Sequence, residues 1–244
     1  FGYKDIIGTS LSSGLDLRNT NEVIAYFKRI NPNVVINCAS FVGGITWGKK
    51  YPADIFTNNS LMIANILNAS NNAGIDRLIN PISNCAYPAK LEYFQEKDFW
   101  NGDMHETVLS YGLTRKAIVV GSWSYAQQYG LDAINLVLSN MFGPEDHFEP
   151  ERSHALGALV GRIYEAKEKK AESIDVWGSG KPIREWLFVE DGAEALVRAI
   201  NCTPTTELTN VGVGTGISVK DLAKCISDVI GFKGILKFDL SKPD

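Results

Sequence analysis

The sequence contains little cysteine and little histidine. Its 244 residues include 4 cysteines and 3 histidines, and no two cysteines have C-x-x-C spacing. We therefore expect reduced thiols and no metal site. Cys38 and Cys225 stand among aliphatic residues, where buried thiols are typical, so only Cys85 is expected to take part in chemistry.

Long apolar runs and a strong charge imbalance are also absent. No apolar stretch is long enough to span a membrane, and no charged and then apolar leader opens the sequence. We therefore expect neither membrane insertion nor secretion, and a cytoplasmic location. The net charge of −4 is spread along the chain, and its only dense basic cluster, residues 167–170, is typical of a solvated helix end. Nucleic acid is therefore not an expected partner.

Strand-like and helix-like segments alternate along the chain, and 45% of its residues are hydrophobic. This alternation predicts an α/β fold, a Rossmann-like doubly wound parallel sheet with helices on both faces. We expect residues 1–139 to form a dinucleotide-binding part, and residues 140–244 to form a small C-terminal substrate-binding lobe interleaved with the last sheet elements. The expected strands are Lys4–Ile7, Asn33–Ala39, Arg77–Ser83 and Asp132–Leu138, and the clearest helices are Pro52–Ala73, Val108–Tyr129 and Val219–Ile230, with another capped by Asn19.

One expected feature of such a fold is missing from the sequence. A doubly wound dinucleotide-binding fold normally opens with a strand and a G-x-x-G-x-x-G turn, whose amides hold the pyrophosphate at a helix N-terminus. Here the sequence opens at Phe1, and no such turn follows Lys4–Ile7. We expect the first strand and the turn to be missing, so that these residues alone bind NADPH poorly and leave sheet edges near Ile6 and Val35 unpaired.

A serine at a strand end and a tyrosine at a helix start indicate a proton-delivery site. Ser83 closes an apolar strand, and Tyr111 begins an amphipathic helix. A tyrosine hydroxyl has a pKa of about 10 in water, so it exchanges protons with a sugar carbonyl only if a fixed positive charge lowers that pKa. Arg115 lies one helical turn after Tyr111 and supplies this charge.

Several sequence blocks follow one another in an order that characterises one enzyme family. They are V-G-G-I at 42–45 with Y-P-A-D at 51–54, S-N-C-A-Y-P at 83–88, Tyr111, N-M-F-G-P at 140–144, Ser153-His154, and V-W-G-S-G-K-P-I-R-E-W-L-F-V-E-D at 176–191. In these blocks the chain resembles the extended short-chain dehydrogenase/reductases, the NAD-dependent epimerase/dehydratase family, and most closely the branch that makes GDP-L-fucose. The resemblance covers nearly the whole chain. It implies that GDP-4-keto-6-deoxy-mannose is epimerised at C3 and C5 and then reduced at C4 by NADPH.

The resemblance implies catalytic roles for four residues. Ser83 and Tyr111 match the proton-donating pair, and Cys85 and His154 match the acid and base of epimerisation. The chemistry agrees, because removing a proton beside a ketone needs a base on one face of the sugar, an acid on the other, and donors to the ketone oxygen. The alternatives are a packed strand-end thiol for Cys85 and an ordinary surface histidine for His154.

Three further residues match substrate-binding positions. Arg184 matches the residue that binds the diphosphate, and Trp177 and Trp186 flank it, as expected where a guanidinium binds phosphate and a base stacks. Asn140 opens the N-M-F-G-P block and is assigned with Trp177 to substrate binding. The alternative for Arg184 is a salt bridge with a neighbouring carboxylate such as Glu185.

The chain departs from the family at the cation that follows the tyrosine. The family pattern is Tyr-x-x-x-Lys, whereas here Arg115 stands in the lysine position and Lys116 comes one residue later. Either cation lowers the tyrosine's pKa, but a planar guanidinium does not reproduce an ammonium that also reaches the nicotinamide ribose. Lys116 points about 100° further around the helix and is the poorer candidate.

The cofactor is expected to be NADP, with NAD possible. Residues 7–13 provide hydroxyl groups and no carboxylate for a ribose 2′-hydroxyl, which favours NADP. The residues that match cofactor-binding positions are Ala39, Ser40 and Val42 after the next strand, Asp16 and Leu17 on the adenine side, and Tyr111 and Arg115.

Two other functions stay open on sequence grounds. One is a different enzyme of the same superfamily, a 4-epimerase or a C4 reductase without epimerisation, in which Cys85 and His154 are inert. The other is a catalytically silent nucleotide-sugar-binding protein or partner subunit. The helices at 52–73 and 108–129 resemble the family's dimer faces, so we expect a homodimer, although their apolar stripes are equally consistent with internal packing.

Overall fold

The computed structural model describes residues 2–148 and 153–242. The chain divides into two compact units. Unit 1 contains residues 1–138 and 190–211, and unit 2 contains residues 139–189 and 212–244. Among the described residues, no helix is both long enough and apolar enough to cross a membrane. The assignment of unit 1 to the cofactor and unit 2 to the substrate stays a prediction.

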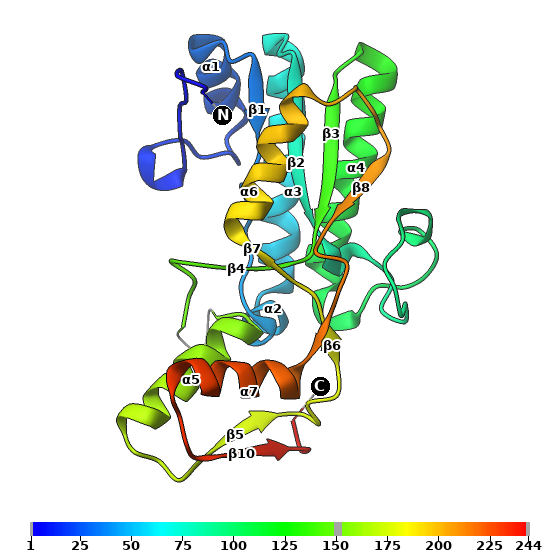
Figure 1. Ribbon diagram of the computed structural model, residues 1–244. Coiled ribbons are helices and arrows are strands. Elements are labelled where there is room, and N and C mark those ends of the chain that lie inside the picture. The colour runs from blue at the N-terminus through cyan, green and yellow to red at the C-terminus, as the bar shows by residue number, and fades with distance from the viewer. Residues whose placement is uncertain (1, 149–152, 243–244) are drawn as a thin grey trace. The chain divides into compact units, whose positions relative to one another are not determined.

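Unit 1 is built on a parallel sheet of four strands in the order β1-β2-β3-β8. Val34 lies opposite Arg77, Leu78 opposite Ala133, and Asn135 opposite Leu208. Figure 1 shows α3 and α4 behind this sheet and α6 in front of it. The strands are β1 (Val34–Ile36), β2 (Arg77–Ser83), β3 (Ala133–Leu138) and β8 (Leu208–Val211), and the helices are α1 (Thr20–Ile30), α2 (Ile45–Lys50), α3 (Pro52–Ala73), α4 (Leu109–Tyr129) and α6 (Val189–Arg198). The short 3-10 turns are η1 (Leu11–Ser13), η2 (Asn84–Ala86), η3 (Glu96–Asp98), η4 (Glu106–Val108) and η5 (Ala199–Asn201). The expected α/β fold with a parallel sheet is confirmed.

Local sequence explains where the longest helix begins and ends. Pro52 occupies the first position of α3, where its missing N–H is not needed. Gly74 ends the helix in the left-handed conformation, with φ of 63°, which glycine adopts without strain. Between them, apolar side chains of α3 pack with α4 and with β2 and β3 in the main core, which includes Ile63, Ile66, Leu78, Ile118 and Val137.

In its described residues, unit 2 contains three small strand pairs and two helices. The pairs are β4 (Asn140–Phe142) with β7 (Trp186–Phe188), β5 (Ser173–Trp177) with β10 (Ile235–Asp239), and β6 (Ile183–Arg184) with β9 (Ile217–Ser218), of which only the last is antiparallel. Helices α5 (Ala155–Glu168) and α7 (Val219–Ile230) contribute Leu159, Ile163 and Ile226 to a second core, with Val176 and Phe232.

Three expectations from the sequence are wrong. Residues 4–7 form no strand, and Ile6 is 76% exposed, because no described strand lies beside this segment. Cys38 is exposed because it lies beyond the end of β1. Cys225 is exposed because the buried stripe of α7, which includes Leu222 and Ile226, faces away from it.

Candidate active site

The predicted proton-delivery residues meet where two neighbouring strands of unit 1 end. Ser83 is the last residue of β2, Cys85 lies in the turn η2 that follows it, and Tyr111 lies in the first turn of α4. Ser40, which follows β1, donates its hydroxyl hydrogen to the Tyr111 oxygen at 3.3 Å. Because the carboxyl ends of parallel strands share one sheet edge, these groups come together although they are distant in sequence.

Arg115 is the cation that accompanies Tyr111. Its guanidinium carbon lies 5.0 Å from the centre of the Tyr111 ring, and the side chain is only 3% exposed. Lys116 turns elsewhere, because its Nζ donates to the Phe99 carbonyl at 2.6 Å and lies 4.9 Å from the centre of the Trp100 ring. Tyr111 therefore contacts the guanidinium of Arg115, whereas Lys116 binds the loop that contains Phe99.

The pKa of Tyr111 is raised, contrary to the net lowering expected from the sequence. Burial of the phenol raises the pKa most, and the positive charge of Arg115 opposes it. A negative charge on Cys85 also raises this pKa, and the Ser40 hydrogen bond lowers it. In this structure Tyr111 therefore holds its proton more firmly than a free tyrosine does, and the charge of Arg115 is what opposes this effect of burial.

Cys85 is half-buried beside the same groups. Its backbone N–H donates to the Ser83 hydroxyl oxygen at 3.4 Å. Burial raises the pKa of the Cys85 thiol, while the Ser83 hydroxyl and the charge of Arg115 lower it. Within the described residues, Ser83 therefore bonds Cys85, whereas the hydrogen bond of the Tyr111 hydroxyl is to Ser40.

Gly112 lets the tyrosine helix approach η2 closely. A Cβ atom at Gly112 would lie 2.8 Å from the Met104 sulfur and 3.1 Å from the Cys85 carbonyl oxygen. Any larger residue would push α4 away from Cys85. Sequence reasoning missed Gly112, because a glycine inside a helix gives no sign of what packs on it.

The turn that contains Ala39, Ser40 and Val42 is fixed by asparagine side chains. The Ala39 N–H donates to Asn37 Oδ1 at 3.3 Å. The backbone of Phe41 exchanges two hydrogen bonds with Asn59 of α3, at 3.0 and 2.8 Å. Sequence reasoning also missed Asn59, because it lies in the middle of a long helix and only the fold brings it to the turn.

Asp16 and Leu17 make their contacts with other residues than the groups around Tyr111. The Asp16 carboxylate forms a salt bridge with Arg18 at 2.6 Å, and the hydrogen bonds from Arg18 lower the pKa of Asp16 to about 2. The Leu17 carbonyl accepts a hydrogen bond from Asn65 of α3 at 2.9 Å. The structure therefore shows Asp16 already paired with a cation of its own.

Unit 2 contains the predicted diphosphate-binding residue. Arg184 is exposed on β6, and its Nη1 donates to the neighbouring Ile183 carbonyl at 3.1 Å. The Glu185 carboxylate accepts from the Gly214 N–H at 2.7 Å, and no salt bridge between Arg184 and Glu185 is found among the described residues.

The other predicted residues of unit 2 are largely open to solvent. His154 is exposed at the N-cap of α5 and makes no side-chain cap bond. Trp177 is 54% exposed, with the Lys242 Nζ 5.7 Å from its ring centre. Asn140 Nδ2 donates to the Glu185 carbonyl at 3.0 Å.

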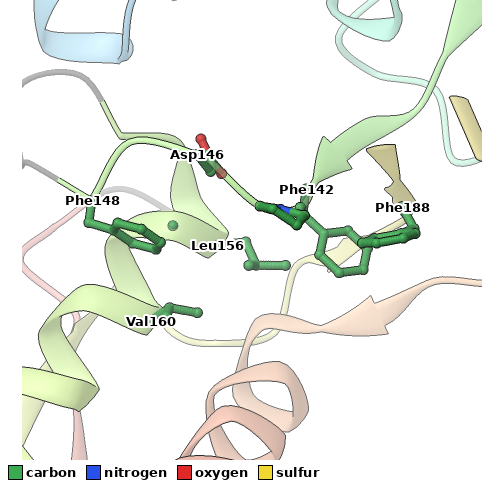
Figure 2. Close-up of a pocket in the computed structure, with 9 residues that line it drawn as sticks. Phe142, Asp146, Phe148, Leu156, Val160 and Phe188 are labelled. Atoms are coloured by element: carbon green, nitrogen blue, oxygen red, sulfur yellow. The ribbon is translucent and has the colours of Figure 1, made fainter. Parts of the chain in front are cut away.

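An apolar pocket of about 290 Å³ lies beside the N-M-F-G-P segment. Figure 2 shows Phe142 and Phe188 at one side and Phe148 at the other. It is lined by Phe142, Gly143, Pro144, Asp146, Phe148, Leu156, Gly157, Val160 and Phe188. None of these is a predicted site residue, so this pocket is not the predicted substrate site.

A parallel sheet covered by helices, with a tyrosine and a cation at the strand ends, defines a Rossmann-like enzyme of the short-chain dehydrogenase/reductase class. The sequence profile of the NAD dependent epimerase/dehydratase family matches residues 10–212. The chain belongs to this family.

Curated relatives and solved structures agree. "Probable GDP-L-fucose synthase 1" of Oryza sativa subsp. japonica is 36% identical, with 94% of this chain and 71% of the relative covered. "GDP-L-fucose synthase" of Escherichia coli is 33% identical, with 94% and 75% covered. A GDP-L-fucose synthetase from Naegleria fowleri bound to NADP is similar with a TM-score of 0.85 and 26% identity, over 94% of this chain and 71% of that one. A GDP-mannoheptose C4 reductase from Campylobacter jejuni with NADP bound is similar with a TM-score of 0.88 and 25% identity, over 100% of this chain and 81% of that one.

Proposed function

We propose that this chain is an NADP-dependent epimerase/reductase that acts on a GDP-linked 4-keto-6-deoxy sugar. The observation that carries the proposal is the meeting of Cys85, Tyr111 and Arg115 at the strand ends of a chain similar to GDP-L-fucose synthases. A thiol, a phenol and a fixed cation together provide the groups that move protons around a ketone.

The residues of unit 1 fit an NADP cofactor. The buried Nε of Arg115 has no partner in the described part of the chain, so it is free to donate to a bound polar group. The turn at Ser40 and the hydroxyl groups of residues 9–13 add further donors without a carboxylate. When bound, NADPH supplies the hydride for reduction at C4. We assign Ala39, Ser40, Val42, Asp16, Leu17, Tyr111 and Arg115 to its binding.

Residues of the chain itself are assigned to the proton transfers. Cys85 and His154 are assigned to remove and return protons at the carbons that flank the ketone. Tyr111 is assigned to donate a proton to the ketone oxygen, and the positive charge of Arg115 assists it by opposing the rise in pKa that burial causes. Ser83 is assigned to the same oxygen. Arg184, Asn140 and Trp177 are assigned to the nucleotide end of the substrate.

A C4 reductase without epimerisation is the second candidate, since a C4 reductase is among the similar structures. The test is to supply the chain with GDP-4-keto-6-deoxy-mannose and NADPH carrying deuterium at the transferable position. We expect deuterium at C4 of a product with the fucose configuration. A C4-reduced product that keeps the configuration of the substrate at C3 and C5 would favour the second candidate. No reduction at an NADPH concentration that saturates the chain would contradict both.

We also propose that two copies of the chain associate through α3 and α4. These helices pack on each other and expose large apolar side chains. The exposed residues are Phe56 and Leu61 of α3, and Leu113, Val120 and Trp123 of α4. Exposed large apolar side chains on neighbouring helices are typical of a subunit interface. The cytoplasmic location stays a prediction.

A further inference from the structure

Three aromatic side chains gather around the turn that follows β1. The ring of Trp47, in α2, lies 5.0 Å from the Phe41 ring and 5.4 Å from the Tyr51 ring, centre to centre, with interplanar angles of 55° and 51°. All three side chains are half-buried, so part of this aromatic cluster reaches solvent. Phe41 directly follows Ser40, whose hydroxyl bonds Tyr111. The aromatic cluster therefore begins beside the proton-delivery groups.

Gly43 lets the Trp47 indole lie against the backbone of this turn. A Cβ atom at Gly43 would lie 2.8, 2.9 and 3.0 Å from Cδ2, Cε3 and Cγ of the indole. Cδ2, the middle atom of these three, is the nearest, so the glycine lies over the face of the ring and not at its edge. One face of the indole is therefore covered by backbone, while the Phe41 and Tyr51 rings contact it at an angle and fix its orientation.

Helix α2 carries Trp47 at the end of the sheet where the predicted proton-delivery groups meet. The helix follows the turn after β1, and Figure 1 shows it beyond the carboxyl ends of the strands of unit 1. A Cβ at Gly48 would lie 3.6 Å from the Thr107 carbonyl oxygen, in η4, which directly precedes α4. Trp47 therefore lies between the two segments that provide Ser40 and Tyr111.

An aromatic ring in this place is suited to holding a sugar. The proposed substrate has a methyl group at C6 and C–H groups along its ring, and this apolar surface gains free energy by packing on an indole. Because its neighbours already fix the indole, little further conformational freedom is lost when a ligand packs on it. Pockets for small molecules typically combine such aromatic contacts with a few polar groups, which Ser40 and Tyr111 provide here.

We propose that Trp47 is a substrate-binding residue, which packs against the sugar ring of the keto-sugar nucleotide beside the groups that transfer protons. The inference rests on the proposed function in taking a nucleotide-linked keto sugar as the substrate. It gives Trp47 no part in binding the nucleotide, so its test compares ligands with and without the sugar.

The experiment is isothermal titration calorimetry with GDP-4-keto-6-deoxy-mannose and with GDP, both without NADPH. Wild type should bind the sugar nucleotide more tightly than GDP. Trp47→Ala should weaken binding of the sugar nucleotide about five- to tenfold, the usual effect of removing one well-packed aromatic contact, and leave the dissociation constant for GDP unchanged. The matched control is Trp123→Ala, which removes an exposed tryptophan of α4 about 18 Å along the helix from Tyr111. It should change neither constant.

Trp47→Phe is the second variant in case the alanine variant does not fold. It keeps a ring, so the sugar nucleotide should bind with a smaller loss of affinity, but it removes the indole as a fluorophore. The sugar nucleotide should change the tryptophan fluorescence of wild type more than GDP does, and this difference should disappear in Trp47→Phe.

Three results would overturn the proposal for Trp47 and leave the proposed function in place. They are an unchanged affinity for the sugar nucleotide in folded Trp47→Ala, an equal loss of affinity for GDP and for the sugar nucleotide, and a fluorescence difference that persists in Trp47→Phe. A wild-type chain that neither binds nor reduces the keto sugar would remove the proposed function together with this inference.

Discussion

At the scale of single residues, the cation beside Tyr111 is where this chain departs from its family. An arginine in the lysine position carries the same charge but a larger, planar and less adaptable head. The structure shows that this head contacts Tyr111 and that Lys116, the other candidate, is bonded to the Phe99 carbonyl. From the sequence, helical geometry favoured Arg115 over Lys116 as the cation beside Tyr111. Only the packing of the folded chain shows which groups each cation contacts.

Reduction of the ketone should require the hydroxyl group of Tyr111, and it should continue when Arg115 is replaced by lysine. We expect Tyr111→Phe to lower the rate of NADPH oxidation with a keto-sugar substrate by about 100- to 10,000-fold, the usual contribution of a general acid. Arg115→Lys should preserve or increase the rate, because lysine restores both the charge and the reach of the family pattern. Steady-state kinetics followed by NADPH absorbance would measure both.

Lys116→Ala is the control for that prediction. It removes a neighbouring cation that contacts Phe99 and Trp100 and not Tyr111, so it should lower stability more than the rate per folded molecule. Loss of reduction in both Arg115→Lys and folded Lys116→Ala would show that Lys116 is the working cation.

The pH dependence of alkylation at Cys85 should show whether the positive charge of Arg115 lowers the pKa of this thiol. Alkylation requires the thiolate, and burial raises the pKa of Cys85, so its alkylation by iodoacetamide should rise with pH at values above those of an ordinary thiol. Arg115→Gln removes a charge that lowers this pKa, so the midpoint should move to still higher pH. Mass spectrometry of the Cys85 peptide would follow the rate, with exposed Cys225 as internal reference. A midpoint that stays in place would show that Arg115 does not act on Cys85.

At the scale of elements, β6 and β9 carry Arg184 at an exposed position, where its Nη1 donates to the Ile183 carbonyl. Arg184 lies opposite Ile217 in this antiparallel pair. The glycine-rich loop at residues 212–216, which precedes β9, packs tightly, since a Cβ at Gly216 would lie 2.4 Å from an Ile183 side-chain carbon. Apart from the bond to Ile183, the guanidinium makes no hydrogen bond among the described residues, so its remaining donors are available to a ligand.

Removing this guanidinium should weaken nucleotide binding. We expect Arg184→Ala to raise the dissociation constant for GDP about ten- to a hundred-fold, the range of a charge-assisted bond to phosphate. Isothermal titration calorimetry with free GDP would measure it, and Lys224→Ala, which removes an exposed cation of α7, is the matched control. Equal affinity in wild type and Arg184→Ala would reassign Arg184 to a structural role.

At the scale of the whole molecule, local signals predicted elements well, whereas contacts between distant residues were not predictable. The bounds of α3, β2 and α7 agree with those predicted from the sequence, and each of the two helices ends at a glycine, Gly74 after α3 and Gly231 after α7. The segment at residues 4–7 has a strand-like pattern but no described neighbouring strand, so the strand predicted from this pattern is not formed. Asn59 could not be found from sequence, since its partners lie 18 and 56 residues away.

The exposed apolar face of α3 and α4 should control the oligomeric state. Trp123 is 54% exposed in the single chain, and we expect Trp123→Glu to convert a dimer into a monomer because a buried charge at a subunit interface is costly. Light scattering coupled to size-exclusion chromatography would give the masses. Tyr164→Glu, a change at an exposed aromatic residue of α5, is the control and should leave the mass unchanged. A wild-type chain that is monomeric at high concentration would contradict the proposed dimer.

The central claim is that this chain moves protons at the carbons beside a sugar ketone. The most direct measurement is NMR of GDP-4-keto-6-deoxy-mannose incubated with the protein in deuterium oxide without NADPH. We predict that solvent deuterium enters C3 and C5, and that Cys85→Ser and His154→Asn each suppress the exchange while GDP affinity stays nearly intact, because each residue moves protons without binding the diphosphate. Absence of exchange with folded, GDP-binding wild-type protein, or undiminished exchange in both variants, would contradict the account.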